Sequence, residues 1–379
     1  MTMRRAIGLM SGTSLDGIDV ALIESDGESV RVLRKGNDQV AALGPTGYRE
    51  YAQAERALLS RALRDAEAVA ARTDRPGCLP EAEAFLTDAH AEAVEAFLSD
   101  NTLTPADIAA IGFHGQTVLH RPREKLTVQI GDGAALARRL GIPVVADLRA
   151  EDVARGGQGA PLVPVFHRAL AQAAGYAGPL AVLNIGGVAN VTLIDSKGNL
   201  LAFDTGPGNA PINDWMKERE GVAYDAGGAR AAGGQIDEAL VAWLLTHPYF
   251  ERTPPKSLDR HWFSHKLAGH LSTADGAATL TAFAARAIRK SLDHVSSDEQ
   301  PMRWIVAGGG TRNLTLMAML GDLLGDRLVN ADTLGWSADY LEAQAFAYLA
   351  LRSLEGLPIT YPSTTGVSAP APGGVLHHP

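Results

Sequence analysis

The feature that most constrains the fold is an internal repeat. The pattern of strands and turn at the start of the chain occurs again near its middle. Residues 7–24 and 182–195 each read as an apolar strand, a glycine-containing turn and a second apolar strand. A third strand candidate follows in each half, SVRVLRK and NLLAFDTG, and a late strand closes each half, AIGFHG and WIVAGGG. Stretches with helical spacing lie between the strands. The repeated order predicts two related α/β domains.

The predicted domains divide the chain unequally. We expect the first domain at 1–150, joined by the C-terminal segment 357–379, and the second at 151–356. Residues 48–71 and 80–98 are rich in Ala, Glu, Leu and Arg at helical spacing, although the whole stretch 29–100 carries no motif. It is expected to pack against the first domain or to form a dimer face. The tail from Ser363, rich in Pro, Gly, Ser and Thr, is expected to be extended.

The first glycine turn is longer than a hairpin needs, since two residues suffice to reverse a strand. It reads GLMSGTSLDGID and places hydroxyl groups and carboxylates between its glycines. Glycine lets the backbone approach a ligand closely, and successive N–H groups form an anion-binding nest. One such turn is more often only a turn, but two in matching positions favour phosphate binding. The chain has no GxxxxGK[ST] P-loop, and no GxGxxG opens a helix after the first strand.

Composition excludes several classes of protein. The formal charge of -9 and the lack of a basic cluster argue against a nucleic-acid-binding protein. The single cysteine, Cys78, cannot form an internal disulfide, and no Cys/His spacing indicates a zinc site. No apolar run is long enough to span a membrane and no signal peptide is evident, so the cytoplasm is the expected location.

Motifs along the whole chain resemble those of the anhydro-N-acetylmuramic acid kinases. They are GLMSGTSLDGID, GFHGQT, TVQIGD, VVADLR, GGQGAPLVP, LNIGGVANVT, FDTGPGN, GGG followed by an asparagine, and STTGVSAPAPGGVL. The resemblance implies the sugar kinase/heat-shock ATPase/actin superfamily, in which two ribonuclease-H-like domains flank an ATP cleft. It also implies a homodimer.

The reaction implied by this resemblance uses ATP and Mg²⁺. Water opens the 1,6-anhydro ring of 1,6-anhydro-N-acetylmuramic acid, and O6 is phosphorylated. The products are N-acetylmuramic acid 6-phosphate and ADP, in the recycling of peptidoglycan.

The nucleotide is expected to contact three glycine-containing segments. The first phosphate loop comprises Gly12, Thr13, Ser14, Leu15, Asp16, Gly17, Ile18 and Asp19, and the second comprises Asn184, Gly186 and Gly187. Gly308, Gly309 and Gly310 are expected to approach the adenosine, with Asn313 capping the next helix. Asp16 or Asp19 is a candidate for holding Mg²⁺ through water, and the alternative is that these carboxylates only cap the turn.

Asp204 in AFDTGPGN is the candidate general base, because water must lose a proton as it attacks the anomeric carbon. It is expected to end an apolar strand and to open a Gly-Pro-Gly turn, which is where open α/β sheets present reactive groups. The alternative is an Asx-turn before Thr-Gly. The resemblance places the catalytic aspartate of the family at this position.

Five residues are candidates for the sugar side. His114 and Gln116 lie in FHGQT after a predicted strand, and Arg149 follows VVADL. A guanidinium group matches a carboxylate bidentately, so Arg149 suits the lactyl carboxylate, although a surface salt bridge is the alternative. Asp147 and Glu342 are weaker candidates, since Glu342 lies within a helix where most carboxylates are solvated.

Two other functions remain open. A chaperone or filament ATPase of the same superfamily would share the phosphate turns but would lack FDTGPGN and GGQGAP. A metal-dependent hydrolase would use His114, His120, Asp147 and His167, but these residues lie on separate elements and form no HxH or HExxH pair.

Overall fold

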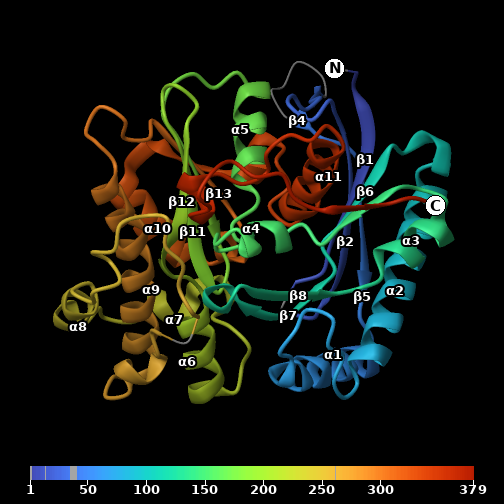
Figure 1. Cartoon of the computed structure of the whole chain (residues 1–379). Coiled ribbons are helices and arrows are strands. Elements are labelled where there is room, and N and C mark those ends of the chain that lie inside the picture. The colour runs from blue at the N-terminus through green and yellow to red at the C-terminus, as the bar shows by residue number, and fades with distance from the viewer. Residues whose placement is uncertain (1, 13, 35–40, 261) are drawn as a thin grey trace. The chain divides into compact units, whose positions relative to one another are not determined.

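The structure, a computed structural model, describes residues 2–12, 14–34, 41–260 and 262–379 (Figure 1). The chain divides into two compact units. The first unit comprises Met1–Gly175 and Tyr340–Pro379, and the second comprises Tyr176–Asp339. Residues 151–175 and 340–356, which the sequence led us to expect in the second domain, therefore pack with the first unit.

The first unit is built on a mixed sheet with the strand order β5-β2-β1-β6-β9-β15. Its strands are β1 (Arg4–Met10), β2 (Gly17–Ser25), β5 (Thr46–Glu50), β6 (Ala110–Phe113), β9 (Val144–Ala146) and β15 (Val375–His377). Strand β2 is antiparallel to both β1 and β5, while β1, β6 and β9 are parallel. The C-terminal strand β15 pairs antiparallel with β9.

The third strand of this sheet is not the predicted one. The segment SVRVLRK contributes only β3 (Leu33–Arg34), which pairs with β4 (Ala41–Ala42) in a separate small sheet. Instead β5, which the sequence placed at the start of a helix, lies beside β2. Its Thr and Tyr residues favour a strand, and the side chains of TGYRE alternate between exposed and partly buried, as on a sheet edge.

The helices of the first unit surround this sheet. They are α1 (Gln53–Asp65), α2 (Leu79–Asp100), α3 (Gly133–Leu140), α4 (Ala150–Ala154), α5 (Pro164–Ala173), α11 (Leu341–Leu354) and α12 (Pro362–Thr365), so the tail that was expected to be extended contains a helical turn. A hairpin of β7 (Gln116–Arg121) and β8 (Leu126–Ile130) completes the unit.

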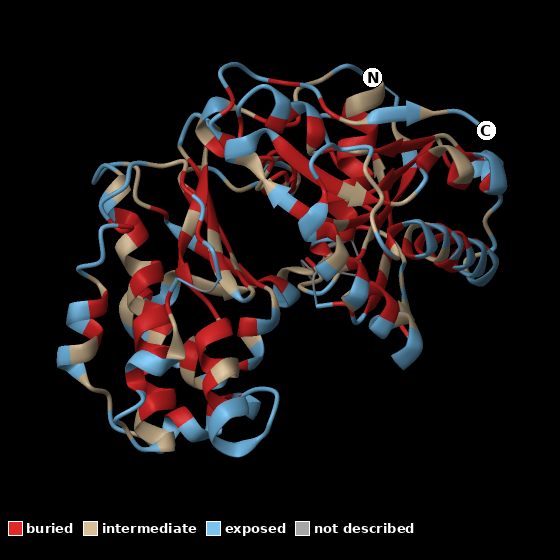
Figure 2. Cartoon of the chain, turned by 60° about the horizontal axis from the view of Figure 1, so that its bottom comes forward, coloured by how far each residue is buried: buried red, intermediate tan, exposed pale blue. Residues whose placement is uncertain are grey.

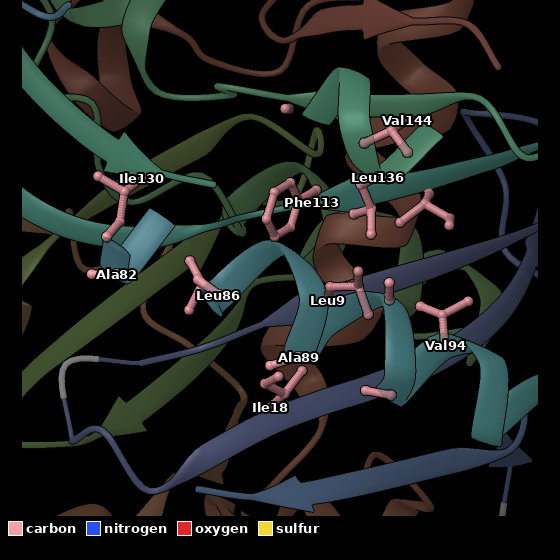
Figure 3. Close-up of a cluster of buried hydrophobic side chains, with 14 of the residues drawn as sticks. Leu9, Ile18, Ala82, Leu86, Ala89, Val94, Phe113, Ile130, Leu136 and Val144 are labelled. Carbon is pink, nitrogen blue, oxygen red and sulfur yellow. The ribbon is translucent and has the colours of Figure 1, made fainter. Parts of the chain in front are cut away.

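Helix α2 supplies much of the core of the first unit (Figure 3). Ala82, Leu86 and Ala89 recur at helical spacing and are buried against Leu9 of β1 and Phe113 of β6. The apolar stripe of one helix thus covers one face of the sheet.

Helix α11 lies against the strands without side chains between the two backbones. A Cβ atom at Gly8 of β1 would lie 1.8 Å from the carbonyl oxygen of Ala343, and one at Gly112 of β6 would lie 2.0 Å from that of Phe346. Only glycine permits this approach. Helix α11 therefore belongs to the first unit because two strands leave room for its backbone.

The second unit repeats the strand order of the first. Its strands are β10 (Leu180–Ile185), β11 (Val188–Ile194), β12 (Leu200–Pro207), β13 (Arg303–Ala307) and β14 (Leu328–Asn330), arranged as β12-β11-β10-β13-β14. The first three are antiparallel neighbours, and β13 and β14 continue parallel to β10. If strands are numbered in chain order within each sheet, both sheets contain the order 3-2-1-4-5, so the predicted duplication is confirmed.

The helices of the second unit are α6 (Ala210–Glu220), α7 (Ala229–Ala232), α8 (Glu238–Leu244), α9 (Thr273–Lys290) and α10 (Leu314–Leu324). Ser272 caps the N-terminus of α9, since its hydroxyl oxygen accepts from the N–H of Asp275 at 3.1 Å. Buried residues gather in the strands and on the inner faces of the helices in each unit (Figure 2). None of the helices in the described ranges combines the length and hydrophobicity that a membrane span requires.

Candidate active site

The first glycine turn joins β1 to β2 and is closed by its own polar groups. Leu15 donates its N–H to the carbonyl of Gly12 at 3.2 Å and has a φ of 55°. The hydroxyl of Ser14 donates to Oδ1 of Asp16 at 2.7 Å, and the N–H of Gly17 donates to the same oxygen at 3.1 Å. Thr13 lies outside the described residues. The predicted loop is thus a tight turn whose Ser14 and Asp16 side chains are exposed.

Asp16 has the chemistry to hold a magnesium ion. One carboxylate oxygen is occupied by Ser14 and Gly17, and the exposed side chain leaves its other oxygen accessible to solvent. Mg²⁺ is usually held by one or two carboxylates together with waters and substrate phosphates. Asp19, on β2, is partly buried and already makes an interaction within the chain. Asp16 therefore fits a water-mediated magnesium ligand better than Asp19.

The second glycine turn joins β10 to β11 and is packed against the FDTGPGN segment. Gly208 donates its N–H to the carbonyl of Gly187 at 2.9 Å, and Asn209 donates to that of Gly186 at 2.8 Å. A Cβ atom at Gly208 would lie 2.4 Å from the Gly186 oxygen. The two motifs LNIGG and FDTGPGN thus form one continuous backbone surface.

The triple glycine follows β13 and lies beside the same region of the second unit. A Cβ atom at Gly308 would lie 2.3 Å from Oδ1 of Asn184, and one at Gly310 would lie 2.3 Å from Cγ2 of Ile185. A Cβ atom at Gly309, in contrast, would meet nothing within 4 Å. Asn313 caps α10 as predicted, since its Oδ1 accepts from the N–H of Leu316 at 3.0 Å. The structure therefore brings Asn184 and the triple glycine together and leaves open space at Gly309.

Asp204 lies within β12 rather than at its end, because the strand continues to Pro207. The register with β11 shifts between Ala189 and Asn190, which leaves Thr205 as the extra residue of a β-bulge next to Asp204. Bulges often redirect a side chain beside a functional site. Asp204 therefore lies inside the strand, whereas the sequence predicted it at the end of the strand, where the turn begins.

The Asp204 carboxylate is held on one side only. Its Oδ2 accepts from the N–H of Leu258 at 2.8 Å, and Oδ1 has no hydrogen bond to any residue that the structure describes. Burial raises the pKa of this carboxyl to about 7, although the Leu258 N–H lowers it. A carboxylate with a pKa near neutrality and one free oxygen suits a general base. It does not form the Asx-turn that was the alternative, since its carboxylate bonds to Leu258 instead of to its own turn.

In the first unit the structure brings His114 and Arg149 together. Nε and Nη2 of Arg149 donate to Nε2 of His114 at 3.2 and 3.1 Å, and Nη1 donates to the carbonyl of Gly159 at 2.8 Å. Burial and the Arg149 charge hold the pKa of His114 well below its usual value, so the ring is neutral and carries its proton on Nδ1. Burial also lowers the pKa of Arg149. Arg149 therefore does not form the surface salt bridge that was the alternative.

A residue that the sequence did not indicate, Asp152, fixes the GGQGAP loop near Arg149. It is buried, and its two oxygens accept from the N–H of Gly159 and the hydroxyl of Thr365, both at 2.6 Å. The contact joins two of the motifs, GGQGAP and STTG. Spacing could not reveal it because the residues are 213 positions apart.

Gln116 and Asp147 differ in their surroundings. Gln116 is 1% exposed, and neither its amide oxygen nor its nitrogen has a partner among the described residues. Asp147 has a φ of 59°, is paired with Arg72, and lines a cavity of about 320 Å³ with His114. An unpartnered buried amide is costly, so Gln116 is a better candidate for ligand contact than Asp147.

Glu342, in the first turn of α11, keeps an exposed surface. Desolvation by the protein around it nevertheless raises the pKa of its carboxyl, and the charge of Arg149 opposes this effect. Glu342 is therefore close enough to Arg149 for their charges to interact, unlike an ordinary solvated helix carboxylate.

The residues suggested for a metal hydrolase do not gather into a ligand set. Within the described ranges, no three His, Cys, Asp or Glu side chains are placed to hold a metal ion together. His114 is hydrogen-bonded to Arg149, and Asp147 forms an ion pair with Arg72. Nδ1 of His120 shares a hydrogen bond of 3.0 Å with the hydroxyl of Thr127. His167 is buried on α5.

Two 3-2-1-4-5 sheets, each with a glycine turn between its first two strands, define the class of two-domain ATP-binding proteins that have ribonuclease-H-like domains. A sequence model of the family described as anhydro-N-acetylmuramic acid kinase matches residues 4–378. The chain belongs to the anhydro-N-acetylmuramic acid kinase family, and it is therefore a kinase.

Two named relatives agree in length with this chain. A protein of Methylorubrum extorquens is 69% identical over 379 residues, which is 100% of both chains. One of Rhodopseudomonas palustris is 56% identical over 378 residues, again 100% of both chains. Both are named anhydro-N-acetylmuramic acid kinase. Among solved structures, component A of the Acidaminococcus fermentans (R)-2-hydroxyglutaryl-CoA dehydratase has a TM-score of 0.46 at 13% identity, covering 93% of this chain and 99% of that one.

Proposed function

We propose that this kinase acts on 1,6-anhydro-N-acetylmuramic acid, opens its anhydro ring with water and transfers the γ-phosphoryl group of ATP to O6. The substrate is the one named for the family and for the relatives. The observation that carries the chemistry is the Asp204 carboxyl, whose pKa burial raises to about 7 and whose Oδ2 alone is held within the chain.

Asp204 serves as the general base in this proposal. Its free oxygen takes a proton from water while the water oxygen bonds to the anomeric carbon C1. The C1–O6 bond of the bridge breaks, and O6 bonds to the γ-phosphorus as ADP leaves. The proton on Asp204 then returns to solvent. A carboxyl with a pKa near the working pH is matched to taking up and releasing a proton.

The two glycine turns bind the phosphates of ATP. Their backbone N–H groups can donate to phosphate oxygens, and glycine lets those groups approach closely. Asp16, with its accessible oxygen, would hold Mg²⁺, with Asp19 as the weaker candidate. When bound, the ion neutralises charge on the phosphates. The open space at Gly309 is where the adenosine of ATP approaches the triple glycine.

The sugar binds at the residues grouped around His114. Gln116 supplies one buried amide group whose oxygen and nitrogen both lack partners among the described residues, and sugar hydroxyl or acetamido groups would satisfy them. Arg149 is preset by His114 and Gly159, and its guanidinium group suits the lactyl carboxylate. Glu342 interacts electrostatically with Arg149, and Asp147 lines the neighbouring cavity.

The decisive test is phosphoryl transfer by purified protein. Incubation with ATP, Mg²⁺ and the anhydro sugar is expected to yield ADP and a 6-phosphorylated reducing sugar. Asp204→Asn is expected to abolish turnover, and Asp322→Asn, at an exposed position on α10, should leave it unchanged. Near-normal turnover of Asp204→Asn would overturn the mechanism.

A second candidate function is an ATPase of chaperone or filament type without a sugar substrate. It would share the glycine turns, and it predicts ATP hydrolysis that is indifferent to the anhydro sugar. ATP consumption that requires the sugar decides for the kinase proposal. We also propose that the enzyme acts as a homodimer in the cytoplasm, which sedimentation and fractionation would test.

A further inference from the structure

The backbone on both sides of Asp204 is fixed by a segment that no motif marks. The N–H of Asp204 donates to the carbonyl of Lys256 at 3.0 Å, and Leu258, two residues on, donates its N–H to the carboxylate. The hydroxyl of Tyr249 donates to the Asp204 carbonyl at 2.5 Å. The base therefore depends on two short pieces of chain, residues 249–250 and 256–258.

Lys256 ties these two pieces together. Its side chain is buried, and Nζ donates to the carbonyls of Tyr249 and Phe250 at 3.2 and 3.1 Å. It also lies 3.0 Å from Nε2 of His294. All three N–H groups of the ammonium thus have an acceptor, and Nζ lies 4.9 Å from the centre of the Tyr249 ring.

We propose that Lys256 is a positioning residue for Asp204: its ammonium group binds segment 256–258 to residues 249–250 and so keeps the Leu258 N–H on the carboxylate. This inference rests on the proposed function, in which Asp204 is the base. Lys256 itself touches neither water nor substrate in this role.

The charges around the network favour this role. Burial lowers the pKa of Lys256 to about 8, with Glu251 and Asp293 opposing that shift and Lys290 and Arg252 adding to it. The lysine is therefore mainly protonated at neutral pH. Burial, and then the lysine charge, lower the pKa of His294, so its ring is neutral and Nε2 accepts. Burial, and then the charge of Asp204, raise the pKa of Tyr249, so its hydroxyl stays protonated.

The test is the pH dependence of kcat/KM in the full-length enzyme. Lys256→Met keeps the apolar stem but removes the donors, so the Leu258 N–H is no longer held in place. Because that N–H stabilises the charged carboxylate, the acid-side midpoint should rise by about half a pH unit or more, and kcat should fall about tenfold. KM for ATP should change less than twofold. Lys256→Arg should restore part of both losses.

The matched control is Lys197→Met, at an exposed position between β11 and β12. It should keep the wild-type profile. Should Lys256→Met not be recovered folded, Lys256→Gln replaces it, since its amide still donates two hydrogen bonds, and a smaller shift of the same sign is expected.

The failure of this inference is distinct from the failure of the proposed function. A folded Lys256→Met enzyme with lower thermal stability but an unchanged midpoint would overturn the positioning role and leave the kinase mechanism intact. Turnover by Asp204→Asn would overturn both.

Discussion

At the scale of single residues, the environment of Asp204 makes a prediction about activity and pH. In the proposed mechanism Asp204 acts as a base only when deprotonated, and burial raises the pKa of its carboxyl to about 7. The kcat/KM of the wild-type enzyme is therefore expected to fall about tenfold per pH unit below that value and to level off between pH 7 and pH 8, above which Lys256 loses the proton of its ammonium group. A rate profile measured from pH 5 to 9 checks this. A flat profile down to pH 5 would contradict the assignment.

The same carboxyl predicts a cost in stability. Its folded pKa lies above the unfolded value of 3.8, so the folded state binds the proton more tightly and stability decreases as the pH rises between the two values. Asp204→Asn removes this cost. We expect the variant to exceed the wild type by about 1 to 3 kcal/mol at pH 8 and to match it near pH 4. Denaturant titrations at both pH values would measure the difference, and equal stability at pH 8 would count against a raised pKa.

Residues of the site were predictable where a motif carried them. Asp204, His114 and Arg149 each follow or occupy an apolar strand within a recognisable segment. Asp152 was not predictable because its partner Thr365 is far away in the sequence, and Lys256 was not predictable because its role depends on the contact of its segment with Asp204 and on His294. No local pattern records such contacts, since a buried lysine and a surface lysine have the same letter in the sequence.

At the scale of elements, the duplicated strand order was predictable from hydrophobic patterning, but the third strand of the first unit was not. Residues 29–35 alternate well enough to form a strand, yet β5 at Thr46–Glu50 takes the place beside β2. Which segment pairs with a strand depends on side-chain packing against that strand and on the connecting loops. The β-propensity of the segment alone does not include these effects. The position of α11 was likewise hidden, because it follows from glycines in distant strands.

The contact of α11 with β1 makes a prediction at this scale. Gly8→Ala places a methyl group 1.8 Å from the Ala343 oxygen, which belongs to backbone and cannot rotate away. We expect a loss of more than about 3 kcal/mol in the free energy of unfolding. The control is Gly321→Ala, since a Cβ atom there meets nothing within 4 Å and the residue lies inside α10. It should be neutral or stabilising by up to about 1 kcal/mol. Equal effects of the two substitutions would contradict this account.

At the scale of the whole molecule, the duplication places one glycine-containing turn in each unit, between its first two strands. The first turn is longer than a hairpin needs, because two residues would close it, and its additional residues carry hydroxyl and carboxylate groups. We propose that both turns bind phosphate groups of the nucleotide. In the same proposal the sugar-side residues belong to the first unit and the base, Asp204, belongs to the second.

This division predicts how the molecule responds to nucleotide. If both turns bind the phosphates, a non-hydrolysable ATP analogue with Mg²⁺ should slow amide hydrogen exchange in residues 11–17 of the first unit and 185–188 of the second. Protection in both should titrate with one apparent Kd, because one ligand makes both contacts. Gly309→Ala, which has space for its methyl group, should fold normally and weaken that Kd about tenfold by occupying the space proposed for adenosine. Gly321→Ala serves again as the control and should leave the Kd unchanged. Protection confined to one unit would contradict the proposal that both turns bind the nucleotide, since the other turn would then be only a turn.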